Sequence, residues 1–354
     1  MSFINHWLRP SILAASAYST PPADGLLKLD AMESPFALAD DLSAKYLTHL
    51  AKAELNRYPN PNASELQKTL RELMNIPDEF GLLLGNGSDE LIQLLALACD
   101  SEATILSVEP SFVMYNLVAK STHLNYVGVN LDADFQLDLP KIQAAIKTHQ
   151  PKLIFIAYPN NPTGNSFERQ SVEKIITATD ALVVLDEAYY AYSADSFLAD
   201  IAKFPNLVVL RTVSKIGFAG LRLGLLIGSK STISELDKLR LPYNINTLTQ
   251  ISAEFLLQQK DQIDKNAQII LAERKRVFAS LNALNNLRAY PSDANFILFK
   301  TPNAQGLFDY LKANKILIKN LTNSPKLQNC LRVTIGNYEQ NQQFLSAVKT
   351  FQKG

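Results

Sequence analysis

The sequence has no excess of either charge and no apolar run of membrane-spanning length. Lys and Arg together number 34, and Asp and Glu also number 34, so the formal net charge is zero. A nucleic-acid-binding domain is expected to carry a basic excess, which this chain lacks. A helix that crosses a bilayer needs about 20 consecutive apolar residues, and the sequence contains no such run. We therefore expect neither a nucleic acid nor a membrane as a partner.

Cysteine and histidine are also scarce. The two cysteines, Cys99 and Cys330, lie far apart and form no CxxC pair, which is typical of reduced thiols in a cytoplasmic protein. The histidines are scattered, with no spacing that suits a metal site, at His6, His49, His123 and His149. Catalysis by a metal ion is therefore not expected.

The N-terminal region contains a short apolar stretch, residues 12–17, that superficially resembles the cleavage region of a signal peptide. The stretch is too short for a signal, and Arg9-Pro10 comes directly before it. We interpret residues 1–30, which show little periodicity, as an arm that packs across the surface or against a partner. The expected location is the cytoplasm.

Between residues 80 and 230, short apolar runs alternate with longer mixed segments. The runs are bounded by turn residues and fall at 104–108, 153–158, 181–185, 207–210 and 223–227. Such runs, separated by segments of helix length, are typical of buried strands in a mostly parallel sheet. The expected fold class is therefore α/β, with residues 31–245 forming a large domain whose sheet lies between helices.

The pattern changes after Pro242. Residues 247–285 keep a helical periodicity without a breaker, which predicts one long helix that joins the large domain to a smaller one. Short strands are expected at 296–299, 316–318 and 331–335. We therefore expect a small α+β domain over residues 246–354 that begins with this interdomain helix.

Polar side chains follow three successive apolar runs. In open α/β sheets, ligands bind outside the carboxyl ends of the strands. Asn161 follows the run at 153–158, and Asp186 and Tyr189 follow the run at 181–185. After the run at 207–210 come Thr212, Ser214, Lys215 and Arg222. The sequence therefore predicts that an amide, a carboxylate, a phenol, an amine and a guanidinium meet at one edge of the sheet.

This set of groups suits pyridoxal 5'-phosphate (PLP). The cofactor withdraws electrons only while its ring nitrogen stays protonated, and the carboxylate of Asp186 can supply the counter-charge. Asn161 and Tyr189 can donate hydrogen bonds to the 3-oxygen of the ring. Lys215 can reach the aldehyde, and its pKa would be lowered by burial and by nearby positive charge such as Arg222.

A phosphate-binding element lies upstream, at residues 85–90. Gly85 and Gly87 come just before Ser88 and Asp89, which begin a run of helical periodicity. Free backbone N–H groups and the helix dipole at such a start attract an anion. The remaining phosphate donors are expected to be Thr212, Ser214 and Arg222.

Each of these motifs is weak by itself. Asn161-Pro-Thr-Gly also forms an ordinary turn, and Asp186 alone could cap a helix. Their value lies in occurring together, in this order, each after a predicted strand. A nicotinamide-dependent dehydrogenase is not expected, because no GxGxxG follows the first strand. A non-catalytic regulatory module with a PLP fold would need a DNA-binding extension, for which the N-terminal segment is too short.

The pattern as a whole resembles the fold-type I PLP-dependent aminotransferases and, within them, the histidinol-phosphate aminotransferases. The resemblance covers nearly the whole chain. It rests on Asn161-Pro-Thr-Gly, on Asp186-Glu-Ala-Tyr189, on residues 214–222, on Glu33-Ser-Pro, on Arg57-Tyr-Pro, on residues 85–90, on Ser111-Phe112 and on residues 332–336. A homodimer with shared active sites is implied by this resemblance.

The resemblance implies a role for each matched residue. Lys215, Asp186 and Tyr189 are the implied catalytic residues: Lys215 forms the Schiff base with PLP, and Asp186 pairs with the ring nitrogen. Phe112 stacks on the ring, and Asn161 and Tyr189 hold the 3-oxygen. The implied neighbours of the cofactor phosphate are Ser88, Asp89, Thr212, Ser214, Arg222 and, from the other subunit, Tyr58. The implied substrate-binding residues are Arg332, Lys319, Tyr18 and Asn161.

The implied reaction transfers the amino group of L-histidinol phosphate to 2-oxoglutarate, giving imidazole acetol phosphate and L-glutamate, in histidine biosynthesis. Two alternatives share the motifs. One is an aromatic amino-acid aminotransferase, in which Arg332 would bind the substrate carboxylate. The other is a threonine-phosphate decarboxylase. The motif residues do not separate these reactions, because one arginine serves either anion.

The chain departs from the family pattern at three positions. Ser34 stands where the N-terminal motif usually has asparagine, Lys319 where relatives often have arginine, and Phe112 where tyrosine is common. A lysine offers a point charge rather than a planar fork, so a phosphate contact at position 319 is less selective in geometry. Phe112 keeps the stacking surface without the hydroxyl.

Overall fold

A computed structural model describes residues 3–14, 17 and 22–353. Its larger sheet has seven strands in the order β2-β8-β7-β6-β5-β3-β4. These strands are β2 (Phe80–Asn86), β3 (Thr104–Glu109), β4 (Asn125–Asn130), β5 (Leu153–Ala157), β6 (Leu182–Asp186), β7 (Leu207–Thr212) and β8 (Leu223–Ser229). Every neighbouring pair is parallel except the two pairs that include β8. The predicted α/β class with a mostly parallel sheet is confirmed.

The reversed direction of β8 has a consequence for the site. Because β8 runs against its neighbours, its first residue lies at the edge where the other strands end. The register pairs Thr212 with Gly224, and Asn86 with Leu223. Arg222, which directly precedes β8, is therefore delivered to the same edge as the ends of β2 and β7.

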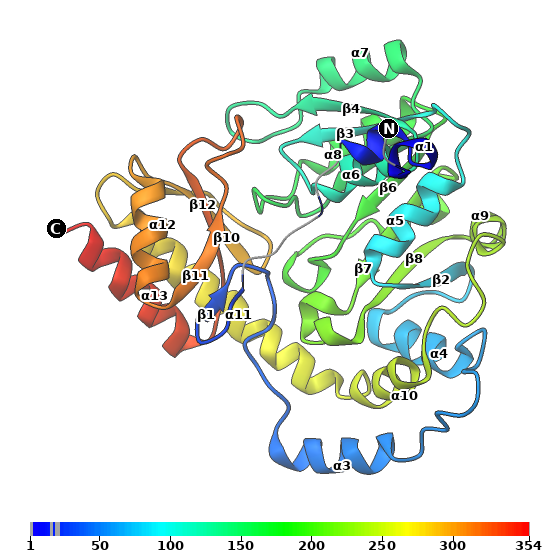
Figure 1. The fold of residues 1–354 in the computed structure, drawn as a ribbon, viewed down its shortest axis with the longest axis horizontal. Coiled ribbons are helices and arrows are strands. Elements are labelled where there is room, and N and C mark those ends of the chain that lie inside the picture. Colours follow the sequence, from blue (N-terminus) through cyan, green and yellow to red (C-terminus); the bar gives the residue numbers. More distant parts are fainter. Residues whose placement is uncertain (1–2, 15–16, 18–21, 354) are drawn as a thin grey trace.

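Helices cover both faces of this sheet (Figure 1). The core on one face includes residues of α4 (Ser64–Met74), α7 (Leu139–His149), α8 (Arg169–Thr177) and α10 (Thr247–Leu256). The core on the other face includes residues of α5 (Ser88–Leu97), α6 (Met114–Ser121) and α9 (Lys230–Asp237). In β5, Ile154 and Ile156 belong to the first core, whereas Leu153 and Phe155 belong to the second. The strands read as continuous apolar runs because they are buried on both sides.

The smaller sheet has five strands in the order β1-β11-β12-β10-β9. They are β1 (Leu27–Leu29), β9 (Arg288–Ala289), β10 (Phe296–Lys300), β11 (Ile316–Asn320) and β12 (Cys330–Thr334). The three short strands predicted after residue 290 correspond to β10, β11 and β12. Its helices are α11 (Lys260–Asn282), α12 (Ala304–Ala313) and α13 (Tyr338–Phe351), on the left in Figure 1. β1, from the predicted arm, pairs in parallel with β11.

The predicted single helix over 247–285 is wrong, because the helix is interrupted between α10 and α11. α10 packs on α4 and on α3 (Asp40–Leu50), whereas α11 packs on α13 and on β9 and β10. Ala253 and Leu257 belong to the core of the larger sheet, and Ile270 and Val277 to the core of the smaller one. α10 is buried against the larger sheet, whereas α11 begins in that same core, at Ile263, and continues into the core of the smaller sheet. The domain limits at 30/31 and 245/246 stay a prediction.

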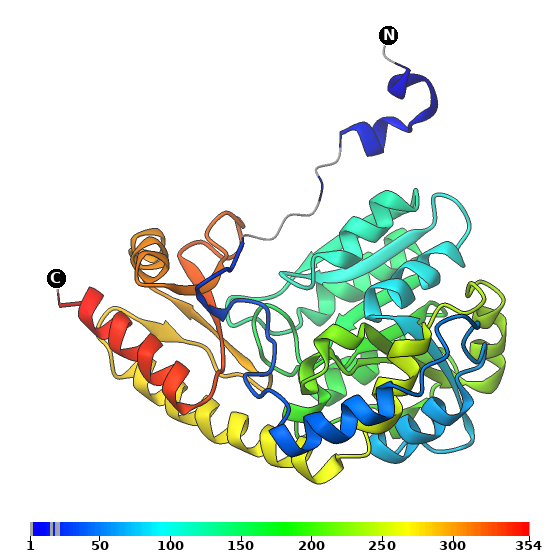
Figure 2. The same ribbon diagram turned by 60° about the horizontal axis from the view of Figure 1, so that its bottom comes forward.

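Two short helices, α1 (Ile4–Trp7) and α2 (Pro10–Leu13), lie outside the two sheets (Figure 2). α2 contacts α6, and the Arg9 guanidinium donates a hydrogen bond to the carbonyl of Ser121. Within the described part of the chain, every helix is too short or too polar to cross a bilayer.

Candidate active site

A cavity of about 250 Å³ lies at the carboxyl edge of the larger sheet. Ten of the residues predicted from the sequence line it: Ser88, Asp89, Phe112, Asn161, Asp186, Tyr189, Thr212, Ser214, Lys215 and Arg222. The wall is completed in part by residues 31–33, from the segment that follows β1. The structure thus brings together side chains from the ends of β5, β6 and β7, the start of β8 and the first turn of α5.

The carboxylate of Asp186 is buried at the end of β6. It accepts hydrogen bonds from the Tyr115 hydroxyl, at 2.7 Å, and from the Ala188 backbone N–H, at 3.1 Å. Burial raises the pKa of Asp186 from 3.8 to about 6, although both hydrogen bonds favour the ionised form. A positive charge placed beside this buried carboxyl would stabilise its ionised form.

Lys215 follows β7, and its partly buried side chain lines the same cavity. Its amine donates a hydrogen bond to the carbonyl oxygen of Ala31, at 3.2 Å. Burial, and next the nearby Arg332 guanidinium, lower the pKa of Lys215 from 10.5 to about 8. Arg222, the example of a nearby positive charge named from the sequence, also lowers this pKa, but its effect is smaller than that of Arg332. The neutral amine is therefore accessible near physiological pH.

Asn161, Tyr189 and Arg332 form a connected group. The Asn161 side-chain amide donates a hydrogen bond to the Tyr189 hydroxyl, at 3.2 Å, and its oxygen accepts one from the Arg332 guanidinium. Arg332 also donates to the carbonyl of Asp30, at 3.0 Å. Because Arg332 lies on β12, this group joins the smaller sheet to the larger one at the cavity.

The first turn of α5 forms the opposite wall. Gly87 precedes the helix with φ of 83°, a conformation that favours glycine, and within the described chain no side chain caps its N–H groups. A Cβ at Gly87 would lie 2.5 Å from the Arg222 guanidinium, and a Cβ at Gly224 would lie 2.5 Å from the Ser88 nitrogen. The two glycines therefore let Arg222 and the helix start approach one another, which creates a cradle for an anion.

Two hydroxyls extend this cradle. The Thr212 hydroxyl donates to the Ser214 hydroxyl oxygen, at 2.9 Å, and accepts from the Ser214 backbone N–H, at 3.1 Å. Arg222 forms an ion pair of 3.4 Å with Asp89, and both side chains are about half exposed. An incoming phosphate can therefore recruit a guanidinium that is only weakly held.

The donor set fits PLP. The cradle at α5 offers amides, hydroxyls and a guanidinium to a phosphate, Asp186 offers a buried carboxylate to a protonated ring nitrogen, and Lys215 offers an amine of lowered pKa to an aldehyde. The lining also includes the Phe112 ring.

Four predicted residues are not among those that line the cavity: Tyr58, Lys319, Tyr18 and Arg332, the last of which donates a hydrogen bond to the cavity residue Asn161. Tyr58 is 80% exposed and stacks on Tyr243, with ring centroids 4.5 Å apart. Lys319 does not line the cavity, but it pairs directly with Arg332 across β11 and β12. Tyr18 lies outside the described residues.

Sequence reasoning missed Tyr115 and the cavity-lining role of Glu33. Tyr115 sits three residues after Phe112 on α6, among apolar residues at helical spacing, so it reads as a core residue. Its one signal is that a fully buried hydroxyl needs a partner, here Asp186. Glu33 was identified only as part of the Glu33-Ser-Pro motif, through its resemblance to the family pattern, and no role was assigned to it. In the structure it forms an ion pair of 2.5 Å with Lys28.

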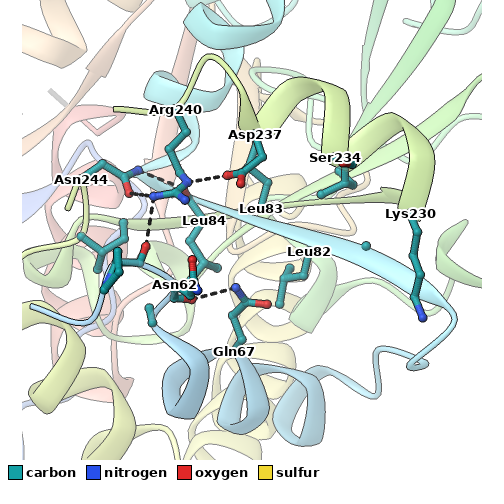
Figure 3. A pocket seen from close by; sticks show the side chains of 15 residues that line it. Asn62, Gln67, Leu82, Leu83, Leu84, Lys230, Ser234, Asp237, Arg240 and Asn244 are labelled. Atoms are coloured by element: carbon teal, nitrogen blue, oxygen red, sulfur yellow. Dashed lines mark hydrogen bonds and ion pairs between the residues drawn. The ribbon is translucent and has the colours of Figure 1, made fainter. Parts of the chain in front are cut away.

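A second cavity, of about 320 Å³, lies at the outer edge of β2 between α4 and α9 (Figure 3). Its principal charged side chain, Arg240, is already paired with Asp237 at 2.6 Å. The cavity contains neither a buried carboxylate nor a buried lysine, so the chemistry belongs to the first cavity. Elsewhere in the described residues, no three His, Cys, Asp or Glu side chains are grouped as metal ligands.

Comparison with known proteins agrees with this interpretation of the cavity. Residues 25–348 match the model of the family described as aminotransferase class I and II. The chain is 63% identical over 351 residues to a protein named histidinol-phosphate aminotransferase from Vesicomyosocius okutanii, with 99% of each chain covered.

Solved structures agree on the fold. The histidinol-phosphate aminotransferase of Clostridium acetobutylicum superimposes with a TM-score of 0.85 at 25% identity, over 93% of this chain and 99% of that one. The enzyme of the same name from Sinorhizobium meliloti, in complex with pyridoxal-5'-phosphate, gives 0.87 at 22% identity over 98% of each chain. This protein belongs to the class I and II aminotransferases and, within them, to the histidinol-phosphate aminotransferases.

Proposed function

We propose that the protein is a PLP-dependent enzyme that transfers the amino group of L-histidinol phosphate to 2-oxoglutarate, giving imidazole acetol phosphate and L-glutamate. One observation carries the proposal: Lys215, Asp186 and the anion cradle of α5 share a single cavity. The name of the relative that is 63% identical supports histidinol phosphate over aromatic amino acids or threonine phosphate.

Three residues perform the chemical work in this proposal. Bound PLP supplies a ring that accepts the negative charge developing on the substrate's α-carbon. Asp186 holds a proton on the ring nitrogen through its negative charge, and Tyr115 keeps that carboxylate oriented. Lys215 removes the α-proton with its amine and later returns a proton, for which a pKa of about 8 is well suited.

Asn161, Tyr189 and Phe112 position the ring. The Asn161 amide and the Tyr189 hydroxyl, already in contact, both reach the cavity and can donate to a ring oxygen. Burial raises the pKa of Tyr189, so its hydroxyl keeps its proton and stays a donor. Phe112 offers an apolar face for stacking. Ser88, Asp89, Thr212, Ser214 and Arg222 surround the phosphate.

Arg332 is the proposed anchor for the substrate's anionic end. Its guanidinium is buried beside the cavity and beside Asn161, and a planar fork binds phosphate or carboxylate in two-point fashion. Lys319 is its direct cross-strand neighbour, so the two side chains project from the same face of the sheet. Together they offer the two positive charges that a phosphate monoester needs, one more than an α-carboxylate requires.

A substrate panel tests the reaction. The purified protein with PLP and 2-oxoglutarate is given histidinol phosphate, phenylalanine or threonine phosphate, and kcat/KM is compared. We expect histidinol phosphate to give the highest value, and Lys319→Met to lower it more for histidinol phosphate than for phenylalanine. A preference for phenylalanine, or loss of carbon dioxide from threonine phosphate, would overturn the substrate assignment.

A homodimer with shared sites is part of the proposal. Tyr58 is highly exposed and stacked on Tyr243, so its hydroxyl is free to serve a cavity in another copy. Mixing Lys215→Ala with Tyr58→Ala subunits tests this, because a hybrid dimer has one site in which neither residue is changed. Random exchange would restore about one quarter of the sites. No recovery in mixtures shown to exchange subunits would place Tyr58 outside the partner's site.

The proposed location is the cytoplasm. Cys99 and Cys330 are both free thiols, and Cys330 is buried. Unpaired cysteines are typical of reducing compartments. Fractionation of the native cells, with this protein followed by immunoblot, tests the proposal, and enrichment in a secreted or membrane fraction would contradict it.

A further inference from the structure

A chain of hydrogen bonds connects the anion cradle to the second cavity. Glu90 is the third residue of α5, and its carboxylate does not line the first cavity. A single oxygen of this carboxylate accepts two hydrogen bonds. One comes from the Asn86 backbone N–H, at 2.6 Å, and the other from the Asn244 side-chain amide, at 2.9 Å. Glu90 thereby fixes the residue next to Gly87, where the cradle begins.

Asn244 is itself held in one orientation (Figure 3). Its amide nitrogen also donates to the carbonyl of Leu84, at 3.0 Å, and its oxygen accepts from Arg240, at 3.4 Å. Arg240 is anchored by Asp237, at 2.6 Å, and by the carbonyl of Pro61, at 3.1 Å. The amide nitrogen faces two acceptors and the amide oxygen faces a guanidinium, so only one of the two flipped orientations of the amide satisfies all three partners.

The position of Glu90 creates an electrostatic conflict. The positive end of α5 attracts any nearby anion; the Glu90 carboxylate lies at this end, and the cofactor phosphate would lie there too. A carboxylate that turned toward the cradle would repel the phosphate. The two donors that bind Glu90, Asn86 and Asn244, hold it on the outer side of the sheet edge. Asn244 is the only one of these two donors supplied by a side chain.

We propose that Asn244, oriented by Arg240, is a positioning residue for the cofactor phosphate: it holds Glu90 away from the cradle and fixes the Asn86–Ser88 turn. The proposal rests on the proposed PLP-dependent function. It assigns no contact between Asn244 and the cofactor, so the effect passes through Glu90 and the backbone of the turn.

The test compares PLP with pyridoxal, which has the same ring and aldehyde but no phosphate. Asn244→Asp keeps the shape of the side chain but replaces the donor with a second carboxylate beside Glu90. A hydrogen bond to a charged group is lost, and we expect PLP to bind about tenfold more weakly. Pyridoxal should bind the variant and the wild type equally. Dissociation constants are measured by absorbance titration of the apoprotein.

Glu90→Gln is the matched control and the rescue. It removes the charge but keeps an oxygen for Asn86, so alone it should weaken PLP binding less than Asn244→Asp does. Combined with Asn244→Asp, it supplies a donor to the new carboxylate, and the double variant should recover most of the lost affinity. The double-mutant cycle measures this coupling directly.

The outcomes are distinct. If wild-type protein binds PLP no better than pyridoxal, the proposed function itself fails. If wild type prefers PLP and Asn244→Asp keeps that preference, the positioning role of Asn244 is refuted. An equal loss for PLP and pyridoxal would show a general structural effect and also refute it. Circular dichroism spectra and thermal unfolding of each variant identify any variant that has not folded.

Discussion

The apoprotein should become more stable when Asp186 is changed to asparagine. Burial raises the pKa of Asp186 from 3.8 to about 6, so the folded state holds a proton that the unfolded state has lost between these pH values. Stability therefore falls as the pH rises through this window and stays low above it. The corresponding cost of ionised Asp186 at neutral pH is about 3 kcal/mol. The amide carries no charge and escapes this cost, but it must find its own partners, so about 3 kcal/mol is an upper limit.

The same change should abolish tight PLP binding, because the counter-charge for the ring nitrogen is lost. Urea unfolding of the apoprotein tests the stability, followed by circular dichroism because the only tryptophan, Trp7, lies in the exposed α1. The gain at pH 7.5 should fall by about half at pH 5, where folded Asp186 is mostly protonated. Asp78→Asn, at an exposed site, is the control. An unchanged or lower stability at pH 7.5, or a gain that does not depend on pH, would refute the reasoning.

Three further predictions concern the cavity. Gly87→Ala should weaken PLP binding at least tenfold, because its Cβ would meet the Arg222 guanidinium, whereas Gly25→Ala, also at positive φ but in open space, should leave PLP affinity unchanged in the same titration. Tyr115→Phe removes a donor to the buried carboxylate and raises its pKa further, so the loss of PLP affinity should be larger at pH 6.5 than at pH 8.5. Arg332→Gln should raise the pKa of Lys215 above about 8, and the rate of absorbance change on adding PLP should then reach its midpoint at higher pH.

The residues at the sheet edge could be predicted from the sequence for a physical reason. A buried parallel strand has a recognisable apolar run, and the residue after the run must lie at the carboxyl edge. Asn161, Asp186 and Lys215 each follow such a run, and the structure brings all three to one cavity. Arg222 precedes its strand, and it reaches the same edge only because β8 is antiparallel, a direction that the apolar run does not reveal.

The break between α10 and α11 had no such local signal. Phe255 and Ile263 are eight residues apart, which keeps the helical spacing of apolar residues across the break, so periodicity alone predicts one helix. Leu257 and Ile263, on the two sides of the break, both belong to the core of the larger sheet, and α11 joins the core of the smaller sheet only from Ile270 onward. Periodicity reports that a helix has an apolar face, but not what that face contacts.

The electrostatics of the site were predictable only in part, for a related reason. Burial follows from the apolar strands, so a raised pKa for a strand-end carboxyl and a lowered pKa for a strand-end amine could be expected. The identity of the charged and polar neighbours depends on contacts between distant segments. Tyr115 is 71 residues from Asp186, and Arg332 is 171 residues from Asn161. These contacts adjust the groups that the strands deliver. Changes at Tyr115 and Arg332 should therefore alter pH dependence and affinity, whereas changes at Asp186 and Lys215 should remove the function itself.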